Sequence, residues 1–242
     1  MSGHSKWANI KHKKGKSDAQ RGQLFTKIGR EIAIAVKNWG PDPVSNSKLR
    51  DVIAKAKSNN MPSENITRSI KKAAGEVDGI NYEVINYEGY GPNGVAVIVE
   101  TLSDNRNRTA GDIRHFFDKY GGNLGATGCV SFMFDQKGQI IISRDQNPDE
   151  DDMMAKALEA GAADFLADDE YYEILTEPQD FTQVREAMEK LGYTFETAEV
   201  TMLPQNFVRL TDPEAIENME KLLERLEDHD DVQNIWHNWE QD

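Results

Sequence analysis

The sequence has little that would tie the chain to a membrane or to an oxidising compartment. It contains one cysteine, Cys129, so no disulfide can form within the chain, and a reducing compartment is expected. Its longest purely apolar runs, Ile32–Val36 and Val95–Val99, are far shorter than the ~20 residues that a membrane-spanning helix needs. The first residues carry lysines but lack the apolar stretch of a secretory signal. These absences predict a cytoplasmic protein without a membrane partner.

The sequence also lacks the residue patterns of a metal site or a catalytic centre. Its five histidines are scattered, and none has a second histidine or cysteine at ligand spacing. No Ser/His/Asp arrangement or carboxylate pair can be singled out among the 42 acidic residues. His229 is interpreted as part of a solvated acidic loop, and Cys129 as a small buried apolar residue. We therefore expect no metal, no cofactor and no enzymatic activity.

A glycine-rich string, Gly89–Gly94, matches the GxGxxG dinucleotide-binding fingerprint by letter. That fingerprint needs a helix directly after it, because the amino terminus of the helix binds the pyrophosphate. Here the apolar run Val95–Val99 follows, and such a run is typical of a strand. The string is therefore interpreted as the turn of a β-hairpin and not as a nucleotide site.

What the sequence does have is two segments of opposite charge. Residues 1–75 hold 16 Lys and Arg against 5 Asp and Glu, a net charge of +11. The other 167 residues hold 12 Lys and Arg against 37 Asp and Glu, a net charge of −25, so the overall charge of −14 conceals the separation. The cationic segment attracts phosphate, and the acidic remainder repels it and so orients the approach. We call residues 1–75 the basic segment.

Within the basic segment the pattern predicts a mobile arm followed by three short helices. Residues 1–17 carry five lysines and little apolar surface, too little to offset the entropy of ordering. Apolar residues then recur at helical spacing from about 18 to 38, from about 49 to 58 and from about 63 to 75. The three helices are expected to form a small bundle with basic outward faces.

The rest of the chain alternates between predicted strands and helices. A hairpin is predicted over residues 82–101, and Thr109–Asp112 resembles a capping box that opens a helix. A strand is predicted at Cys129–Phe134. Near the end, Asp212 followed by proline predicts the start of a helix, and a final strand is predicted over Val232–Trp239.

Between Gln139 and Leu203 the predicted order of elements is β-α-β-β-α-β, the ferredoxin-like pattern. The segments on either side of it could share one sheet, which predicts that this part is inserted into another domain. The fold class is therefore α+β with several domains. The predicted domains are a basic helical domain, 1–78; a discontinuous α+β domain, 79–135 with 205–242; and an inserted ferredoxin-like domain, 136–204.

The basic segment carries the strongest functional signal in the sequence. Lysine and arginine release counterions from phosphate, an aromatic side chain can stack on a base, and a flexible arm can follow a groove. We therefore predict a nucleic acid as the partner, although charge alone does not distinguish DNA from RNA. The predicted contacts are Lys6, Trp7, Lys11, His12, Lys13, Lys14, Lys16, Lys27, Arg30, Lys48, Arg50, Lys55, Lys57, Arg68, Lys71 and Lys72.

A second candidate for nucleic-acid binding lies outside the basic segment, at Asn105, Arg106, Asn107 and Arg108. Two guanidinium groups in a loop before a helix could bind phosphate. The alternative is that both arginines pair with nearby acidic side chains. Both interpretations are open at this point.

Five blocks of the sequence together resemble the signature blocks of a known family. They occur in the family's order, and the resemblance runs from one end of the chain to the other. On these blocks the chain is identified as a member of the YebC/PmpR family. The blocks are Gly3–Lys14, Asn60–Pro62, Tyr87–Gly94, Leu102–Thr109 and Gly121–Gly125.

The resemblance implies a helical N-terminal domain followed by two α+β domains, one inserted in the other, as the residues themselves predict. It also implies a cytoplasmic bacterial protein that acts as a DNA-binding transcriptional regulator. Relatives in mitochondria resemble translational activators, and some bacterial members are linked to ribosomes stalled on proline-rich sequence.

Two functional hypotheses follow, and the family resemblance favours the first. In the first, the basic segment binds duplex DNA near promoters, and the acidic domains contact RNA polymerase or another regulator. In the second, the same segment binds ribosomal or transfer RNA, the acidic domains face basic ribosomal proteins, and the protein is a ribosome-associated translation factor that relieves stalling. A third possibility is a scaffold whose basic segment docks on an acidic protein.

Overall fold

The computed structural model describes residues 18–75 and 82–241 and divides into two compact units. Unit 1 combines the described residues up to 75 with residues 136–201, and unit 2 combines residues 82–135 with 202–241. The predicted arm, residues 1–17, lies outside the described residues. Within the described ranges, no helix is both long enough and apolar enough to cross a membrane.

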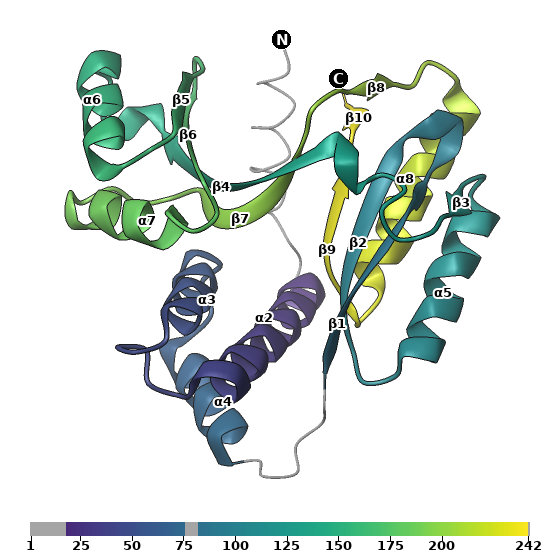
Figure 1. The fold of residues 1–242 in the computed structure, drawn as a ribbon, viewed down its shortest axis with the longest axis horizontal. Helices are drawn as coiled ribbons and strands as arrows, with labels where there is room; N and C mark the ends of the chain where they lie inside the picture. The colour runs from purple at the N-terminus through teal and green to yellow at the C-terminus, as the bar shows by residue number, and fades with distance from the viewer. Residues whose placement is uncertain (1–17, 76–81, 242) are drawn as a thin grey trace. The chain divides into compact units, whose positions relative to one another are not determined.

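Unit 1 begins with the three helices predicted for the basic segment, so this prediction is confirmed (Figure 1). Their apolar stripes meet in one core, in which Ile28, Ile32 and Leu49 are completely buried. Burial of one such side chain stabilises the fold by about 1.5–3 kcal/mol. The helices are α2 (Asp18–Trp39), α3 (Ser47–Ser58) and α4 (Ser63–Gly75).

Asn46 joins α2 to α3 and sets where α3 begins. Its Oδ1 accepts a hydrogen bond from the Leu49 amide at 2.9 Å, which caps the first turn of α3. Its Nδ2 donates to the carbonyl oxygens of Ala35 at 2.9 Å and of Gly40 at 2.8 Å, at the end of α2. With only 2% of its surface exposed, Asn46 satisfies buried backbone groups of both helices.

The second part of unit 1 has the predicted β-α-β-β-α-β order. Its four strands form one sheet in the order β5-β6-β4-β7, with β5 and β4 both antiparallel to β6. This strand order is that of a ferredoxin-like fold. The elements are β4 (Phe134–Ser143), α6 (Glu150–Ala160), β5 (Asp164–Ala167), β6 (Tyr171–Thr176), α7 (Phe181–Lys190) and β7 (Thr197–Pro204).

Both helices of this part bury side chains against its sheet. Met153 of α6 and Val184 of α7 are fully buried in one cluster with Ile140 of β4. On the same sheet, Gly138 lies where β4 passes Thr176, and a Cβ at this position would clash with the threonine Oγ1 and with the Phe181 side chain. The glycine is therefore required by the close approach of two neighbouring strands.

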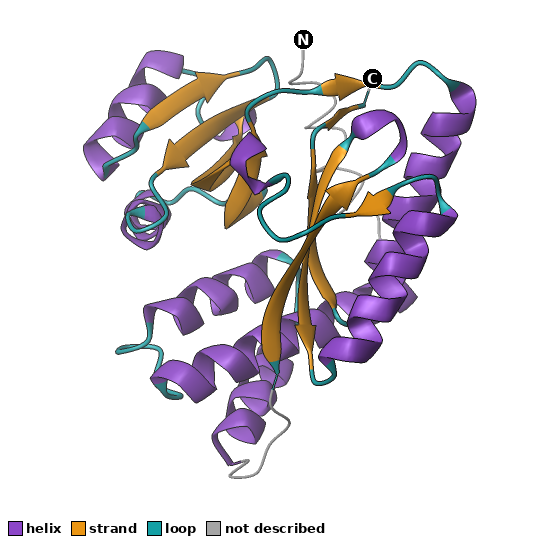
Figure 2. Cartoon of the chain, turned by 45° about the vertical axis from the view of Figure 1, so that its right-hand side comes forward, coloured by secondary structure: helices purple, strands orange, loops and turns teal. Residues whose placement is uncertain are grey.

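Unit 2 contains an antiparallel sheet in the order β3-β1-β2-β9 and two helices, α5 and α8, on one of its faces (Figure 2). The strand β9 follows the inserted part and pairs with β2, which precedes it, so the two flanking segments share a sheet as predicted. The elements are β1 (Glu83–Tyr90), β2 (Ala96–Ser103), α5 (Arg106–Lys119), β3 (Asn123–Leu124), β8 (Val208–Arg209), α8 (Pro213–Asp228), β9 (Val232–His237) and β10 (Trp239–Glu240).

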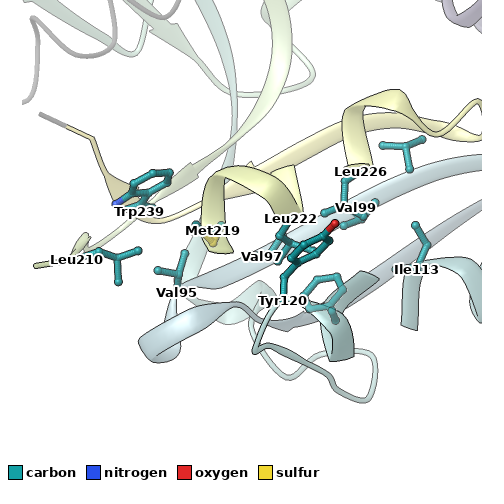
Figure 3. Close-up of a cluster of buried hydrophobic side chains, with 12 residues drawn as sticks. Val95, Val97, Val99, Ile113, Tyr120, Leu210, Met219, Leu222, Leu226 and Trp239 are labelled. Carbon is teal, nitrogen blue, oxygen red and sulfur yellow. The ribbon is translucent and has the colours of Figure 1, made fainter. Parts of the chain in front are cut away.

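Alternation along β2 separates two cores on the two faces of this sheet. Val97 and Val99 point towards the helices, where Ile113 of α5 and Leu222 of α8 complete a buried cluster (Figure 3). Ile98 points to the opposite face and belongs to a second cluster. Burial on both faces explains why the sequence of β2 is almost continuously apolar. The turn before β2 confirms that Gly89–Gly94 lies in a hairpin.

The strand predicted at Cys129–Phe134 is wrong for all but its last residue. Ser131–Met133 forms a short 3-10 helix, and β4 begins at Phe134. The backbone amides of Gly128, Val130 and Ser131 all donate to the carboxylate of Glu88, at 2.8–3.0 Å, and so are not available to a neighbouring strand. In the β3-β1-β2-β9 sheet of unit 2, the strand that pairs with β1 at the sheet edge is instead the two-residue β3, which was not predicted.

The start predicted for α5 is also wrong, by about one turn. The helix begins at Arg106 because Asn105 caps it, with its Oδ1 accepting from the Arg108 amide at 3.1 Å. Thr109, the predicted cap, is fully buried inside the helix, and its hydroxyl is 2.7 Å from a carboxylate oxygen of Asp231. Arg106 and Arg108 therefore lie in the first turn of a helix and not in a loop before it.

The strand predicted over Val232–Trp239 is interrupted at Asn238. This residue is fully buried, and its Oδ1 accepts from the Ala96 amide at 2.8 Å while its own carbonyl accepts from the Val208 amide at 2.7 Å. The chain thereby leaves β2, and β10 pairs in parallel with β8.

The further division of unit 1 into a helical domain and an inserted domain stays a prediction.

Candidate nucleic-acid interface

The predicted nucleic-acid contacts of the arm lie outside the described residues. They comprise five lysines, Trp7 and His12. The described part of the basic segment, residues 18–75, still holds 11 Lys and Arg against 5 Asp and Glu. A net charge of +6 thus remains on the three helices.

The outer face of α4 carries three of the predicted contacts close together. Arg68, Lys71 and Lys72 are all exposed, and their spacing places them on one side of the helix. The opposite side of α4 contributes Ile66 and Ile70 to the helical core. We call Arg68, Lys71 and Lys72 the α4 cationic stripe.

The four predicted contacts on α3 divide into two exposed and two paired side chains. Lys48 and Lys57 are exposed. The Arg50 guanidinium donates to Glu186 Oε1 at 2.8 Å, and the Lys55 ammonium donates to Glu31 Oε1 at 2.9 Å. Arg50 and Lys55 are half-buried, so α3 offers fewer accessible cations than its sequence suggests.

The partner of Arg50 belongs to a group of charges that joins α3 to α7 within unit 1. Arg185 of α7 is 3% exposed and lies 3.4 Å from Asp51 Oδ1 through its Nε and 3.0 Å from Glu189 Oε2 through its Nη1. The Thr182 hydroxyl donates to Asp51 Oδ2 at 2.7 Å. Burial raises the pKa of the Asp51 carboxyl, against the lowering effect of Thr182 and Arg185. A buried guanidinium with such partners ties the two helices together.

On α2 the predicted contacts Lys27 and Arg30 are half-buried and take part in other interactions. Two basic residues of α2 that the sequence analysis did not select, Arg21 and Lys37, are exposed. They were missed because neither lies in a dense run of basic residues. Their exposure follows from the helical phase that Ile28 and Ile32 set.

At the second candidate site, the structure favours the alternative that Arg108 pairs with acidic side chains. Its Nη2 lies 2.8 Å from Asp104 Oδ1 and 2.9 Å from Asp231 Oδ2. Asn105 is engaged as the helix cap, whereas Arg106 and Asn107 are exposed in the first turn of α5. The four residues are adjacent, but they do not form a single cationic surface.

The segment around His229 differs from the solvated loop that was predicted. Asp231 is 4% exposed and accepts hydrogen bonds from Ser103, Thr109 and Arg108. Burial raises the pKa of Asp231, but these three hydrogen bonds outweigh it and hold that pKa below its ordinary value. His229 Nε2 lies 3.2 Å from Asp112 Oδ2.

Two other sequence interpretations concern metal ligands and Cys129. In the part of the chain that the structure describes, no group of three or more His, Cys, Asp or Glu is placed to hold a metal ion. Cys129 is half-buried against an apolar cluster, whereas the sequence predicted a buried residue. Burial raises the pKa of its thiol, and the nearby Glu88 carboxylate raises it further.

Comparison with known protein families accounts for nearly the whole chain. Residues 5–76 match the model described as the TACO1/YebC protein N-terminal domain. Residues 82–239 match the model described as the TACO1/YebC second and third domain. The boundary between the two matches coincides with the change from the basic segment to the acidic remainder.

Curated relatives and a solved structure agree with the family match. A protein of Acetivibrio thermocellus named "Probable transcriptional regulatory protein" is 68% identical over 239 residues, covering 99% of both chains. A protein of Ruminiclostridium cellulolyticum with the same name is 64% identical, covering 100% of this chain and 98% of the relative. The crystal structure of a conserved hypothetical protein from Aquifex aeolicus superposes with a TM-score of 0.81 at 47% identity, covering 93% of this chain and 92% of the other. The chain therefore belongs to the TACO1/YebC family.

Proposed function

We propose that this protein is a DNA-binding transcriptional regulator that acts through its basic segment and has no catalytic role. The proposal is supported above all by the α4 cationic stripe, in which Arg68, Lys71 and Lys72 are exposed on one side of one helix. The relatives named as probable transcriptional regulatory proteins add to this support.

The physical basis of binding is the release of counterions from the phosphate backbone. Each phosphate that a lysine or arginine neutralises releases cations into solution, which favours binding and makes it depend steeply on salt. The charge of −25 outside the basic segment repels the same backbone and restricts which side of the protein can approach it. That acidic remainder is then free to contact RNA polymerase or another regulator.

The test of the proposed interface is a titration of duplex DNA at several salt concentrations, followed by fluorescence anisotropy. In the triple variant Arg68→Gln, Lys71→Gln, Lys72→Gln, the affinity should fall. The slope of log K against log salt should flatten by about 0.9 for every phosphate contact that is lost. A second variant, with Lys11, Lys13 and Lys14 changed to Gln, tests the arm in the same way.

A matched control removes three exposed cations outside the basic segment, at Arg114, Lys190 and Lys221. Its slope should equal that of the wild type. If the control and the α4 variant lose the same amount of binding, only the overall charge matters and the proposed interface is wrong.

The nature of the nucleic acid is decided by crosslinking the protein in cells and sequencing both the DNA and the RNA recovered with it. Enrichment of promoter DNA is the expected result. Enrichment of ribosomal RNA with promoter DNA at background would overturn the transcriptional proposal and favour a translation factor, with acidic surfaces facing basic ribosomal proteins.

A further inference from the structure

A pocket of about 390 Å³ lies in unit 2, where the last turns of α5 and α8 come together. Its size falls within the range of pockets that hold small organic ligands, about 300–1,000 Å³. None of its residues belongs to the basic segment or to the second candidate site. The lining residues are His115, Phe116, Lys119, Tyr120, Arg225, Asp228 and His229.

The charge of the pocket is opposite to that of the unit around it. The described residues of unit 2 hold 17 Asp and Glu against 7 Lys and Arg. The pocket nevertheless gathers Lys119, Arg225 and two histidines against a single carboxylate, that of Asp228. The Arg225 side chain is hydrogen-bonded to Tyr120, and the charges of Glu224 and Asp228 also act on its guanidinium. Lys221, one turn before Arg225 on α8, does not line the pocket and pairs with Glu217 at 2.6 Å.

Tyr120 lies beside both cations of the pocket, with the Lys119 ammonium 5.4 Å from the centre of its ring. Its side chain is 8% exposed and lies at the edge of the core formed with α8 (Figure 3). A hydrogen bond with the Arg225 side chain, together with the charges of Lys119 and Arg225, lowers the pKa of the phenol despite its burial. The same surroundings that favour a phenolate favour any other anion at that position.

Hydrogen bonds offset part of the negative partial charge at the ends of the two helices. Unpaired carbonyl oxygens at a helix C-terminus carry partial negative charge. At the end of α5, the Tyr120 amide donates to Phe116 O at 3.2 Å, and the Gly122 amide donates to Phe117 O at 2.8 Å. At the end of α8, the His229 amide donates to Leu226 O at 3.3 Å. These bonds satisfy carbonyl groups that would otherwise repel an anion.

The pocket also offers flat apolar walls beside its cations. The Phe116 ring lies edge-on to His229, with centroids 6.0 Å apart and planes at 74°. It is tilted against His115, with centroids 6.2 Å apart. Aromatic rings next to cations are the combination that proteins use to bind a nucleotide, because a base stacks on the ring while the phosphate meets the charge.

We propose that this pocket binds the phosphate of a nucleotide, with Lys119 and Arg225 neutralising the phosphate and the Phe116 and His115 rings contacting the base. The ligand is either a free mononucleotide or an unpaired nucleotide at the end of a nucleic acid. The site goes beyond the proposed function, because it does not involve the basic segment.

The experiment is calorimetric titration of the full chain with two probes, AMP and a short single-stranded RNA that carries a 5′-phosphate. Binding of at least one probe is expected. It should weaken about tenfold or more in the double variant Lys119→Gln, Arg225→Gln, because two charge-assisted contacts are lost. Binding of AMP identifies a free nucleotide as the source, and binding of the RNA alone identifies the end of a nucleic acid.

Three further variants separate this site from a general effect of charge. The double variant Arg114→Gln, Arg209→Gln removes two exposed cations of unit 2 that do not line the pocket, and it should bind like the wild type. The α4 triple variant should also keep its affinity for AMP. A loss of DNA binding at the α4 cationic stripe can therefore be distinguished from a loss of nucleotide binding at this pocket. The conservative variant Lys119→Arg, Arg225→Lys, with an unchanged unfolding temperature, should retain binding.

The proposal is overturned if the wild type binds neither probe at millimolar concentration, or if the Lys119→Gln, Arg225→Gln variant binds as well as the wild type. Tyr120 supplies an independent readout, because a bound phosphate opposes the formation of phenolate beside it. Ligand should therefore raise the pH at which tyrosinate absorbance appears, and the Tyr120→Phe variant should lose that shift.

Discussion

At the level of single residues, the buried Glu88 side chain anchors the exposed loop that contains Gly125 and Gly128. The carboxylate is 4% exposed and accepts three backbone hydrogen bonds, from Gly128, Val130 and Ser131. Its own carbonyl accepts from the Gly125 amide at 2.8 Å. One buried acidic side chain thus replaces the strand pairing that this segment lacks.

Replacement of Glu88 by Gln should destabilise the fold by about 1–3 kcal/mol, because an amide nitrogen would then face at least one backbone N–H that needs an acceptor. Burial raises the pKa of Glu88, but the three amides outweigh it and hold that pKa below its ordinary value of 4.5. Its contribution is therefore fully present above pH 4.5 and is lost as the pH falls through the folded-state pKa.

Urea unfolding at neutral and at acidic pH measures this contribution. The difference between wild type and Glu88→Gln should shrink on acidification. The control is Glu83→Gln, at an exposed position of the same strand, which should leave stability almost unchanged. An equal loss in the two variants at neutral pH would contradict the role of Glu88.

At the level of elements, the start of α5 depends on the side chain of Asn105. Substitution of this cap by Ala should cost about 1 kcal/mol, since the Arg108 amide loses its acceptor. The control is Asn107→Ala, at an exposed position in the first turn of the same helix. Chemical denaturation of both variants checks the prediction, and a cost confined to Asn107→Ala would refute the assignment of the cap.

The same helix illustrates what the sequence could and could not predict. Periodicity placed the apolar face of α5 correctly, because Ile113 and Phe117 recur at helical spacing. It could not place the first turn, because Thr109 and Asn105 are both good caps and the choice depends on Asp231, 122 residues away from Thr109 in sequence. The strand predicted at Cys129–Phe134 failed for a similar reason, since Glu88 is distant in sequence from the amides that it binds.

For the candidate nucleic-acid interface, too, the sequence predicted some of the exposed cations and missed the tertiary contacts of others. The density of basic residues predicted the α4 cationic stripe, because exposure there follows directly from helical phase. It could not predict that Arg50 and Lys55 are paired, because their acceptors depend on tertiary contacts. The pocket of unit 2 was missed entirely, since Lys119 and Arg225 lie in segments that no local pattern connects.

At the level of the whole molecule, the basic segment and the acidic remainder are connected within unit 1 by the contact of α3 with α7. Glu186 lies 2.8 Å from Arg50 Nε and 3.4 Å from Arg185 Nη2, so one acidic side chain serves both helices. The acidic residue holds a cation that would otherwise be available to phosphate. Glu186 is the carboxylate that pairs with Arg50, whose Nη1 also donates to the carbonyl oxygens of Pro43 at 2.9 Å and of Val44 at 3.0 Å.

Replacement of Glu186 by Gln should therefore strengthen binding of duplex DNA through Arg50. If Arg50 gains one phosphate contact, the slope of log K against log salt should become steeper by about 0.9. The control, Glu177→Gln, removes the same charge from the same part of unit 1, but its partner is Lys137, outside the basic segment. Anisotropy titrations that give both variants the same slope would show that overall charge, and not the release of Arg50, governs the change.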